Sequence, residues 1–196
     1  MGFLTRDELV AIGFKAVGEG VCVSDKASIH GASRVSLGAH VRIDDFCVLS
    51  AGKGGITIGR NVHVAVYSCL IGAGHISVGD FANISSRVAI YSSNDDYSGA
   101  WMTNPTVPAK YTNVAHDDVR IGSHAIVGSG SVVLPGVTVG DGAAIGALSL
   151  IRVDCEPFGV YAGAPARKLK DRKRDLLDIA AKFLAESADS TEPTRS

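Results

Sequence analysis

The 196-residue sequence has few aromatic residues, no long apolar run and no excess of charge of either sign. Aromatic residues make up 6% of the chain, which disfavours a β-sandwich built around large rings. Nineteen basic and twenty acidic residues give a net charge of -1, so no overall basic field exists to hold nucleic acid. Every apolar run is far shorter than the ~18 residues that span a membrane, and the first residues lack a basic region followed by an apolar stretch. We therefore expect a cytoplasmic protein that binds neither nucleic acid nor membrane.

Cysteine is also scarce, and its spacing matches none of the common metal or redox motifs. The four cysteines stand at positions 22, 47, 69 and 155. Such separations fit neither a zinc-binding pair nor a CxxC motif. We expect reduced cysteines in the core, with a catalytic nucleophile or a disulfide as the alternatives.

What the sequence does contain is a six-residue repeat. From position 121 it divides into IGSHAI, VGSGSV, VLPGVT, VGDGAA, IGALSL and IRVDCE. Each repeat opens on a branched apolar residue, and its fifth place is occupied, in order, by Ala125, Ser131, Val137, Ala143, Ser149 and Cys155. Neither the 3.6-residue period of a helix nor the alternation of a long strand produces this pattern.

The same repeat continues upstream in groups of three, which begin at positions 17, 37, 58, 78, 121 and 139. Every insertion falls after the third repeat of a group, and the longest covers 91–120. A three-sided coil explains this placement, because insertions at one vertex leave the stacking of the coils undisturbed. The sequence thus predicts an all-β solenoid of about six coils over 17–156, with the large residue of each repeat inside.

The flanking segments are predicted to be helical. Thr5 and Glu8 form a capping-box pattern, so residues 1–16 should form a cap with a helix from Arg6 to Gly13 over the open edge of the first coil. Residues 157–186 should include a helix from Pro165 to about Glu186. Residues 187–196 are expected to form a flexible tail.

This pattern resembles the hexapeptide-repeat acyltransferases, whose left-handed parallel β-helix is the source of the expected handedness. Three runs, IDDFC at 43–47, DFANISSR at 80–87 and DDYSG at 95–99, resemble one branch in particular. That branch contains N-acyltransferases that modify nucleotide-linked 4-amino-4,6-dideoxysugars, including the anthrose-pathway type. The similarity extends from DELVAIGF near the N-terminus to ARKLKDRKR near the C-terminus.

The resemblance implies the site. The serine and the aspartate that lie beside the amine and the thioester in that branch fall on Ser85 and Asp95. Backbone groups at Ser129 and Ala147 would bind the pantetheine of coenzyme A, and Arg152 and Arg167 would contact its phosphates. Asn94 and Asp96, on either side of Asp95, are further candidates for substrate contacts. His63 and His75 are candidates for contacts to the sugar or pyrophosphate, and Tyr67 and Trp101 for contacts to the base or sugar. Ordinary surface or corner positions are the alternative for these four residues.

The residue types suit an amine acceptor. In sugar O-acetyltransferases of this fold a histidine accepts the hydroxyl proton, but residues 94–96 here are Asn, Asp and Asp. A free amine is already nucleophilic, and positioning it near the thioester can supply ~7 to 11 kcal/mol. We therefore interpret Asp95 as a group that orients the amine. Simple turn or corner roles for Asp95 and Ser85, and a solvated helix face for the basic run after Arg167, are the structural alternatives.

Flat solenoid faces rich in small residues, together with the family resemblance, imply a homotrimeric enzyme with active sites between subunits. It would transfer an acetyl or 3-hydroxybutyryl group from acyl-CoA to a nucleotide-linked aminosugar, most simply a dTDP sugar, for O-antigen, lipopolysaccharide or other glycan synthesis. The alternatives are a sugar O-acetyltransferase and a non-catalytic β-helix subunit. A zinc enzyme of the γ-carbonic anhydrase type, with ligands among His63, His75, His116 and His124, is a further alternative, but we expect no metal.

Overall fold

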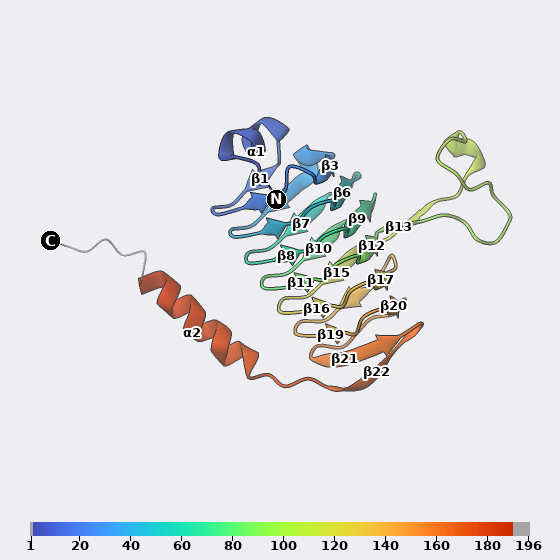
Figure 1. The fold of residues 1–196 in the computed structure, drawn as a ribbon. Coiled ribbons are helices and arrows are strands. Elements are labelled where there is room, and N and C mark those ends of the chain that lie inside the picture. Colours follow the sequence, from blue (N-terminus) through green and yellow to red (C-terminus); the bar gives the residue numbers. More distant parts are fainter. Residues whose placement is uncertain (1, 190–196) are drawn as a thin grey trace.

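The computed structural model describes residues 2–189, and their strands form a three-sided left-handed parallel β-helix (Figure 1). Face 1 contains six parallel strands: β1 (Ala16–Val17), β4 (Val35–Leu37), β7 (Ile56–Ile58), β10 (Ile76–Val78), β15 (Val119–Ile121) and β18 (Thr138–Val139). Face 3 contains another six: β3 (Ser28–His30), β6 (Val48–Ala51), β9 (Cys69–Gly72), β12 (Ala89–Tyr91), β17 (Val132–Val133) and β20 (Leu150–Ile151).

Face 2 is longer than the other two faces because it continues past the last complete coil. Its parallel strands are β2 (Cys22–Val23), β5 (Arg42–Ile43), β8 (His63–Val64), β11 (Asn83–Ile84), β16 (Ile126–Val127), β19 (Ala144–Ile145) and β21 (Gly159–Gly163). An antiparallel strand, β22 (Ala166–Asp171), then pairs with β21. This last strand covers the edge that β21 would otherwise leave unpaired.

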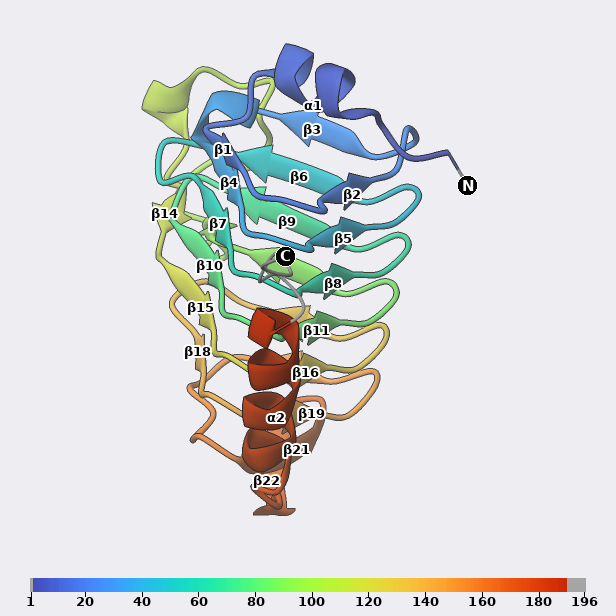
Figure 2. The ribbon, with the colours of Figure 1, turned by 90° about the vertical axis from the view of Figure 1, so that its left-hand side faces the viewer.

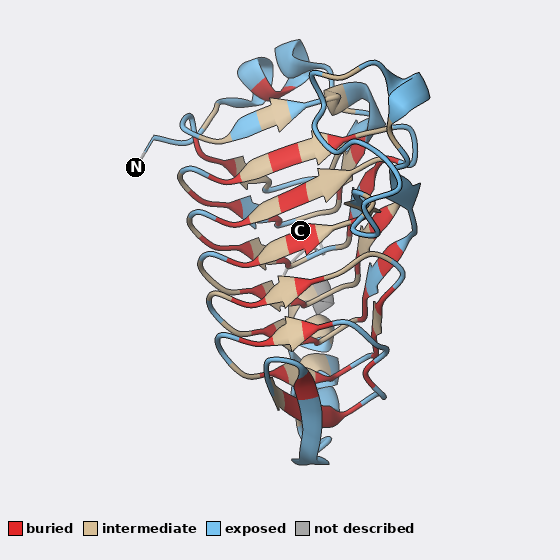
Figure 3. Cartoon of the chain, turned by 90° about the vertical axis from the view of Figure 1, so that its right-hand side faces the viewer, coloured by how far each residue is buried: buried red, intermediate tan, exposed pale blue. Residues whose placement is uncertain are grey.

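The strand register confirms the predicted repeat. The residues that open successive groups pair in the order Val17, Leu37, Ile58, Val78, Ile121 and Val139. Branched residues from all three faces point inward and form one continuous core, so that buried and partly exposed residues alternate along the strands (Figure 3). The six residues at the fifth place of the repeats are also buried, at 4% exposure or less. Small side chains at these places leave room for the chain to turn at each vertex.

The vertices hold the chain in left-handed backbone conformations. At the vertex between faces 2 and 3, Phe46, Tyr67 and Arg87 have φ values of 61°, 62° and 59°. Such conformations are unfavourable for residues other than glycine. The peptide N–H groups of Tyr67 and Arg87 donate to carbonyls of the preceding coil, those of Asp45 and Val66 respectively. Hydrogen bonds between coils therefore fix the corners on which side chains are displayed.

Helix α1 (Arg6–Ile12) begins with the predicted capping box and ends at Gly13. The Thr5 hydroxyl accepts from the Glu8 amide, and the Glu8 carboxylate accepts from the Thr5 amide at 2.7 Å. Leu9 is buried, and Arg6 donates to the carbonyls of Val17 and Gly18 in the first coil. The helix thus caps the first coil, as Figure 2 shows at the top of the solenoid.

The C-terminal segment corrects two sequence predictions. A partial seventh coil follows the sixth, because Cys155 bridges to Val139 and Tyr161 pairs with Ile145. The vertex before Cys155 is shorter than the others. A six-residue repeat continued from Ile151 therefore does not coincide with the inward-facing positions Cys155 and Tyr161. The helix expected from Pro165 is also wrong at its start, since residues 166–171 form β22.

Helix α2 (Leu176–Asp189) begins eleven residues later than predicted and extends beyond 186. The predicted tail therefore begins within this helix, and residues 190–196 lie outside the described part of the chain. The Phe183 ring packs edge-on against the Phe81 ring, with centroids 6.1 Å apart, at the vertex between faces 1 and 2. Within residues 2–189, no helix has the length and apolar character needed to cross a membrane.

Candidate active site

One vertex of the solenoid gathers several of the predicted site residues. Tyr67, Ser85, Ser129 and Ala147 follow β8, β11, β16 and β19 and occupy successive corners between faces 2 and 3. Hydrogen bonds join these corners, since the Ser85 amide donates to the Val127 carbonyl and the Leu148 amide donates to the Ser129 carbonyl. Residues that are distant in sequence thus form one row along the long axis of the molecule.

The Ser85 corner is held rigidly from inside the solenoid. The buried Ser68 hydroxyl donates to the Ser85 carbonyl at 2.8 Å and accepts from the Val88 amide at 3.2 Å. The Ser68 hydroxyl thus has a partner both as donor and as acceptor in the core. The Ser85 side chain is half-buried on the outside of the corner, where it can reach a ligand.

Arg167 continues this row, but Arg152 does not. Arg167 lies on β22 opposite Ala162, whose side chain is next to Gly146 and so to the Ala147 corner. Arg152 directly follows β20, at the vertex between faces 3 and 1. The structure therefore places Arg167 near the Ala147 corner, at the end of the row that contains Ser129, and places Arg152 at a different vertex.

His63 lies on the outer surface of face 2, one coil from the Asn83 position that precedes Ser85. Its Nε2 atom is 2.8 Å from the carboxylate of Asp44, which is 5% exposed. Arg42 donates to the other carboxylate oxygen at 2.7 Å. Burial opposes ionisation of Asp44, but hydrogen bonds from Arg42 and His63 outweigh it and lower the pKa of this carboxyl. Asp44 thereby fixes the His63 ring; sequence reasoning missed this role, although Asp44 is part of the IDDFC run.

The predicted residues of the long insertion lie together at its base. The insertion leaves the vertex between faces 3 and 1 through a two-stranded stalk, β13 (Ser93–Asn94) and β14 (Ala115–His116), and contains a short 3-10 turn at Ala109–Tyr111 (Figure 1). Asp95 is exposed and follows β13 directly.

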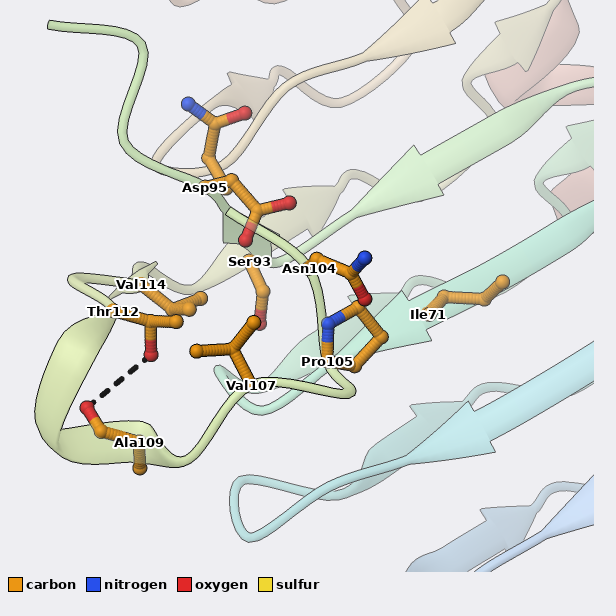
Figure 4. Close-up of a pocket in the computed structure, with 10 residues that line it drawn as sticks. Ile71, Ser93, Asp95, Asn104, Pro105, Val107, Ala109, Thr112 and Val114 are labelled. Atoms are coloured by element: carbon orange, nitrogen blue, oxygen red, sulfur yellow. Dashed lines mark hydrogen bonds between the residues drawn. The ribbon is translucent and has the colours of Figure 1, made fainter. Parts of the chain in front are cut away.

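A cavity of about 470 Å³ opens beside Asp95 (Figure 4). Its polar lining residues are Ser93, Asn94, Asp95, Asn104 and Thr112, and its apolar lining residues are Ile71, Pro105, Val107, Ala109 and Val114. The apolar lining was not predicted from the sequence. Its nearest indication was the segment NPTVP, which begins about ten residues after Asp95.

A second cavity, of about 380 Å³, shares Asp95 with the first and is also lined by Asp96 and Trp101. Asp96 accepts hydrogen bonds from the amide and the hydroxyl of Ser98, and these lower the pKa of its carboxyl. Asp96 therefore starts the turn that sequence reasoning considered as an alternative for this segment. Trp101 remains half exposed at the cavity wall.

Tyr67 stacks on Phe46 with ring centroids 5.0 Å apart, and the Arg87 guanidinium lies 5.8 Å from the Tyr67 ring. Tyr67 is 54% exposed. Because Phe46 and Arg87, from the coils on either side, already contact the ring, the structure leaves no free ring face for stacking of a base or sugar.

The histidines considered as zinc ligands have four separate partners. His63 bonds to Asp44, His75 to the Gly54 carbonyl, His116 to Ser93, and His124 stacks on Phe81. No three His, Cys, Asp or Glu side chains are grouped for metal binding in the described part of the chain. All four cysteines have free thiols. Burial raises the pKa of the Cys47 and Cys155 thiols to about 11, so little reactive thiolate exists there near neutral pH.

Ser85 and Asp95 are not brought together within one chain. Ser85 lies at the corner before β12, and Asp95 lies on the stalk that follows this strand, at the next vertex. The cavity beside Asp95 is not lined by Ser85. A single chain therefore displays two halves of the predicted site at two ends of face 3.

A three-sided parallel solenoid with this repeat and one long loop defines a hexapeptide-repeat transferase. Residues 118–152 match the family described as bacterial transferase hexapeptide (six repeats). A dTDP-4-amino-4,6-dideoxy-D-glucose acyltransferase of Escherichia coli is 53% identical over 183 residues, which cover 93% of this chain and 95% of that protein. The chain belongs to the family of these aminosugar acyltransferases.

Solved structures agree with this assignment. The N-acyltransferase AntD from Bacillus cereus, in complex with dTDP and 3-hydroxybutyryl-CoA, is 41% identical and superposes with a TM-score of 0.91 over 95% of this chain and 98% of that chain. A chloramphenicol acetyltransferase of Agrobacterium fabrum is a more distant relative, with 34% identity over 53% of this chain and 55% of its own length.

Proposed function

We propose that this acyltransferase is a homotrimer that moves an acetyl or 3-hydroxybutyryl group from coenzyme A to the amine of a dTDP-linked 4-amino-4,6-dideoxysugar. The reaction is a direct attack of the amine on the thioester carbon within a ternary complex. It takes place in the cytoplasm, where acyl-CoA is available, and it prepares a sugar for O-antigen, lipopolysaccharide or a related glycan.

The observation that carries this proposal is the mixed lining of the cavity beside Asp95. The lining combines a carboxylate, amides and hydroxyls with several apolar side chains. A 4-amino-4,6-dideoxysugar needs both kinds of contact, since its amine and hydroxyls are polar while its terminal methyl group is apolar. The Asp95 carboxylate can accept a hydrogen bond from the amine or from its ammonium form, and the apolar side chains can pack on the methyl group.

The named relatives support the same reaction. AntD has been crystallised with dTDP-4-amino-4,6-dideoxyglucose and coenzyme A, and with dTDP and 3-hydroxybutyryl-CoA. Variants of AntD altered at one serine and at one aspartate have also been crystallised, and these two residues are ten positions apart. Ser85 and Asp95 have the same separation in this sequence.

The remaining predicted residues supply a donor site. Along the vertex between faces 2 and 3, Ser129 and Ala147 are exposed residues in line with Ser85. We assign the pantetheine chain to this row, with Arg167 at its end on the phosphates. The thioester would then lie near Ser85, and the aminosugar would approach it with Tyr67, His63 and the loop residues around it.

The separation of Ser85 and Asp95 supports a trimer. In a three-fold assembly the loop of one subunit can reach the Ser85 vertex of the next, so each active site combines two chains. Face 3 is suited to such packing, because its central outward side chains are small or apolar and half-buried: Val48, Cys69, Ala89, Val132 and Leu150. Sedimentation at assay concentration should give about three times the single-chain mass of 20.3 kDa, and a single-chain mass would overturn the assembly.

The direct test uses matched acceptors. dTDP-4-amino-4,6-dideoxyglucose and the analogue with a 4-hydroxyl group are each incubated with acetyl-CoA or 3-hydroxybutyryl-CoA, and the products are read by mass. We expect acylation of the amine alone. Transfer to the hydroxyl analogue would favour a sugar O-acetyltransferase, and failure to bind coenzyme A would favour a non-catalytic subunit.

A further inference from the structure

The stalk of the long loop contains a serine-histidine pair to which the proposed reaction assigns no role. The Ser93 Oγ atom lies 2.8 Å from the Nδ1 atom of His116, across the antiparallel pair β13 and β14. Ser93, on β13, also lines the cavity beside Asp95, which lies two positions further along the chain. His116 is exposed to solvent. The pair thus connects the cavity with bulk water.

The direction of the hydrogen bonds follows from the neighbouring peptide. The Ala73 amide donates to Ser93 Oγ at 2.8 Å. Since this bond uses one acceptor position of the oxygen, the hydroxyl proton is free to point to His116 Nδ1 when the imidazole is neutral. When the ring is protonated, Nδ1–H donates to the serine oxygen instead, and the hydroxyl proton can point into the cavity.

The reaction needs a route of this kind. Primary amines such as that of lysine have a pKa near ~10.4, so the acceptor arrives mainly as an ammonium ion. Attack on the thioester requires the free amine, and one proton must leave for each amide formed. An ordinary aspartate, with a pKa near ~3.9, is too weak a base to take this proton. A neutral imidazole is the side chain best suited to do so near neutral pH.

We propose that Ser93 and His116 form a proton relay from the acceptor ammonium to solvent, an inference that rests on the proposed function. The ammonium N–H bond breaks as Ser93 Oγ takes this proton, and the Ser93 hydroxyl passes its own proton to His116 Nδ1. The imidazolium then loses a proton to water and is neutral again. The free amine forms the C–N bond while the C–S bond breaks, and its second proton goes to the leaving thiolate. His116 thus acts through Ser93, while Asp95 orients the nitrogen.

This relay accounts for the missing histidine of the 91–98 segment. That segment has Asn94, Asp95 and Asp96 where the histidine of the O-acetyltransferases would be expected. The structure places a histidine 23 residues beyond Ser93 beside the same strand, because the loop returns antiparallel to its own start. Apart from Asp95 and Asp96, the nearby titratable groups are Asp117 and Asp118, which follow β14, and His75, whose amide donates to Asp118.

The principal test is His116→Asn with saturating acyl-CoA and dTDP-4-amino-4,6-dideoxyglucose. Asparagine can still accept the Ser93 hydrogen bond, but it cannot carry the proton. We expect kcat to fall at least tenfold near neutral pH, with both KM values within twofold of wild type. The deficit should shrink as the pH is raised, because the amine then loses its proton in solution. His40→Asn, at an exposed histidine on the vertex between faces 1 and 2, is the matched control and should behave as wild type.

Two further variants test whether the Ser93–His116 hydrogen bond transfers a proton or only stabilises the stalk. His116→Gly should regain part of its kcat when imidazole is added to the buffer. Ser93→Ala should lose about as much kcat as His116→Asn, and the double variant should be no slower than either one, because both act in one path.

The outcomes distinguish this inference from the proposed function. If His116→Asn retains kcat within twofold, or if the losses of the two single variants multiply, the relay is overturned while wild-type acylation still supports the proposed function. If the wild-type protein acylates no aminosugar, both the relay and the proposed function are overturned.

Discussion

The role of Asp95 can be tested by removing only its charge. Asp95→Asn keeps the size of the side chain and one hydrogen-bonding oxygen. If Asp95 orients the amine, the variant loses a charge-assisted contact to the acceptor, for which ~1.5 to 3 kcal/mol is typical. Asp95 is exposed at the mouth of the cavity, so solvent screens the interaction and the lower end of this range applies. Since ~1.4 kcal/mol corresponds to a factor of ten, KM for the aminosugar should rise about tenfold.

The effect on turnover should be smaller. When the relay removes the proton, Asp95 contributes position alone, and kcat should fall less than tenfold. Steady-state kinetics with saturating acyl-CoA would measure both constants, after circular dichroism confirms that the variant is folded. Asp117→Asn is the matched control: it makes the same charge change near the base of the loop, at an exposed residue outside the cavity lining.

A different result would refute this reasoning. If Asp95→Asn reduced kcat a hundredfold or more at unchanged KM, proton transfer to the carboxylate would belong to the transition state. Asp95 would then be the base, and the Ser93 pair would be left without a function in catalysis.

Three other variants test the core, a buried carboxylate and the donor site. Ile84 is fully buried between valines of the adjoining coils. Ile84→Ala should lower the free energy of unfolding by about 3 to 4 kcal/mol, measured in urea at fixed protein concentration, because the stacked strands cannot move together to fill the cavity. A loss below about 1 kcal/mol would contradict the packing argument. Asp44 has a pKa below its ordinary value of 3.8, so its ionised form stabilises the folded state above that pH, and the stabilisation is lost as the pH falls through the folded value. Asp44→Asn should therefore lower Tm at neutral pH, with a difference from wild type that narrows below about pH 4, whereas a constant difference would exclude the charge as its source. Arg167→Ala should weaken coenzyme A binding about tenfold in calorimetry and leave dTDP-sugar binding unchanged, and Lys170→Ala on the same strand is the control; equal weakening in both variants would indicate a general effect of surface charge.

Local patterns predicted the solenoid because its determinants are local. A branched residue at every sixth place must point inward at each coil, and the insertions show at which vertex the chain is free to leave the stack. The capping box of α1 was predicted for the same reason, since Thr5 and Glu8 lie three residues apart.

The errors at the C-terminus arise from contacts that sequence periodicity does not contain. Residues 166–171 have good helix formers, but the unpaired edge of β21 offers them a complete set of backbone hydrogen bonds. Pairing with an existing edge outweighs a helix propensity of a few tenths of a kcal/mol per residue. The short vertex before Cys155 likewise shifted the repeat out of phase and concealed the partial seventh coil.

For the candidate site, the sequence by itself determined the residue types and the loop that carries Asp95, and the family resemblance singled out Ser85. Only the tertiary structure decided which of them meet. Stacking of the coils aligns Ser129 and Ala147 with Ser85, while the length of β12 keeps Ser85 apart from Asp95 within one chain. The return of the loop places His116 against Ser93 across 23 residues of sequence. Such neighbours depend on where a chain turns back on itself, and that is set by packing over the whole solenoid rather than by the residues on either side.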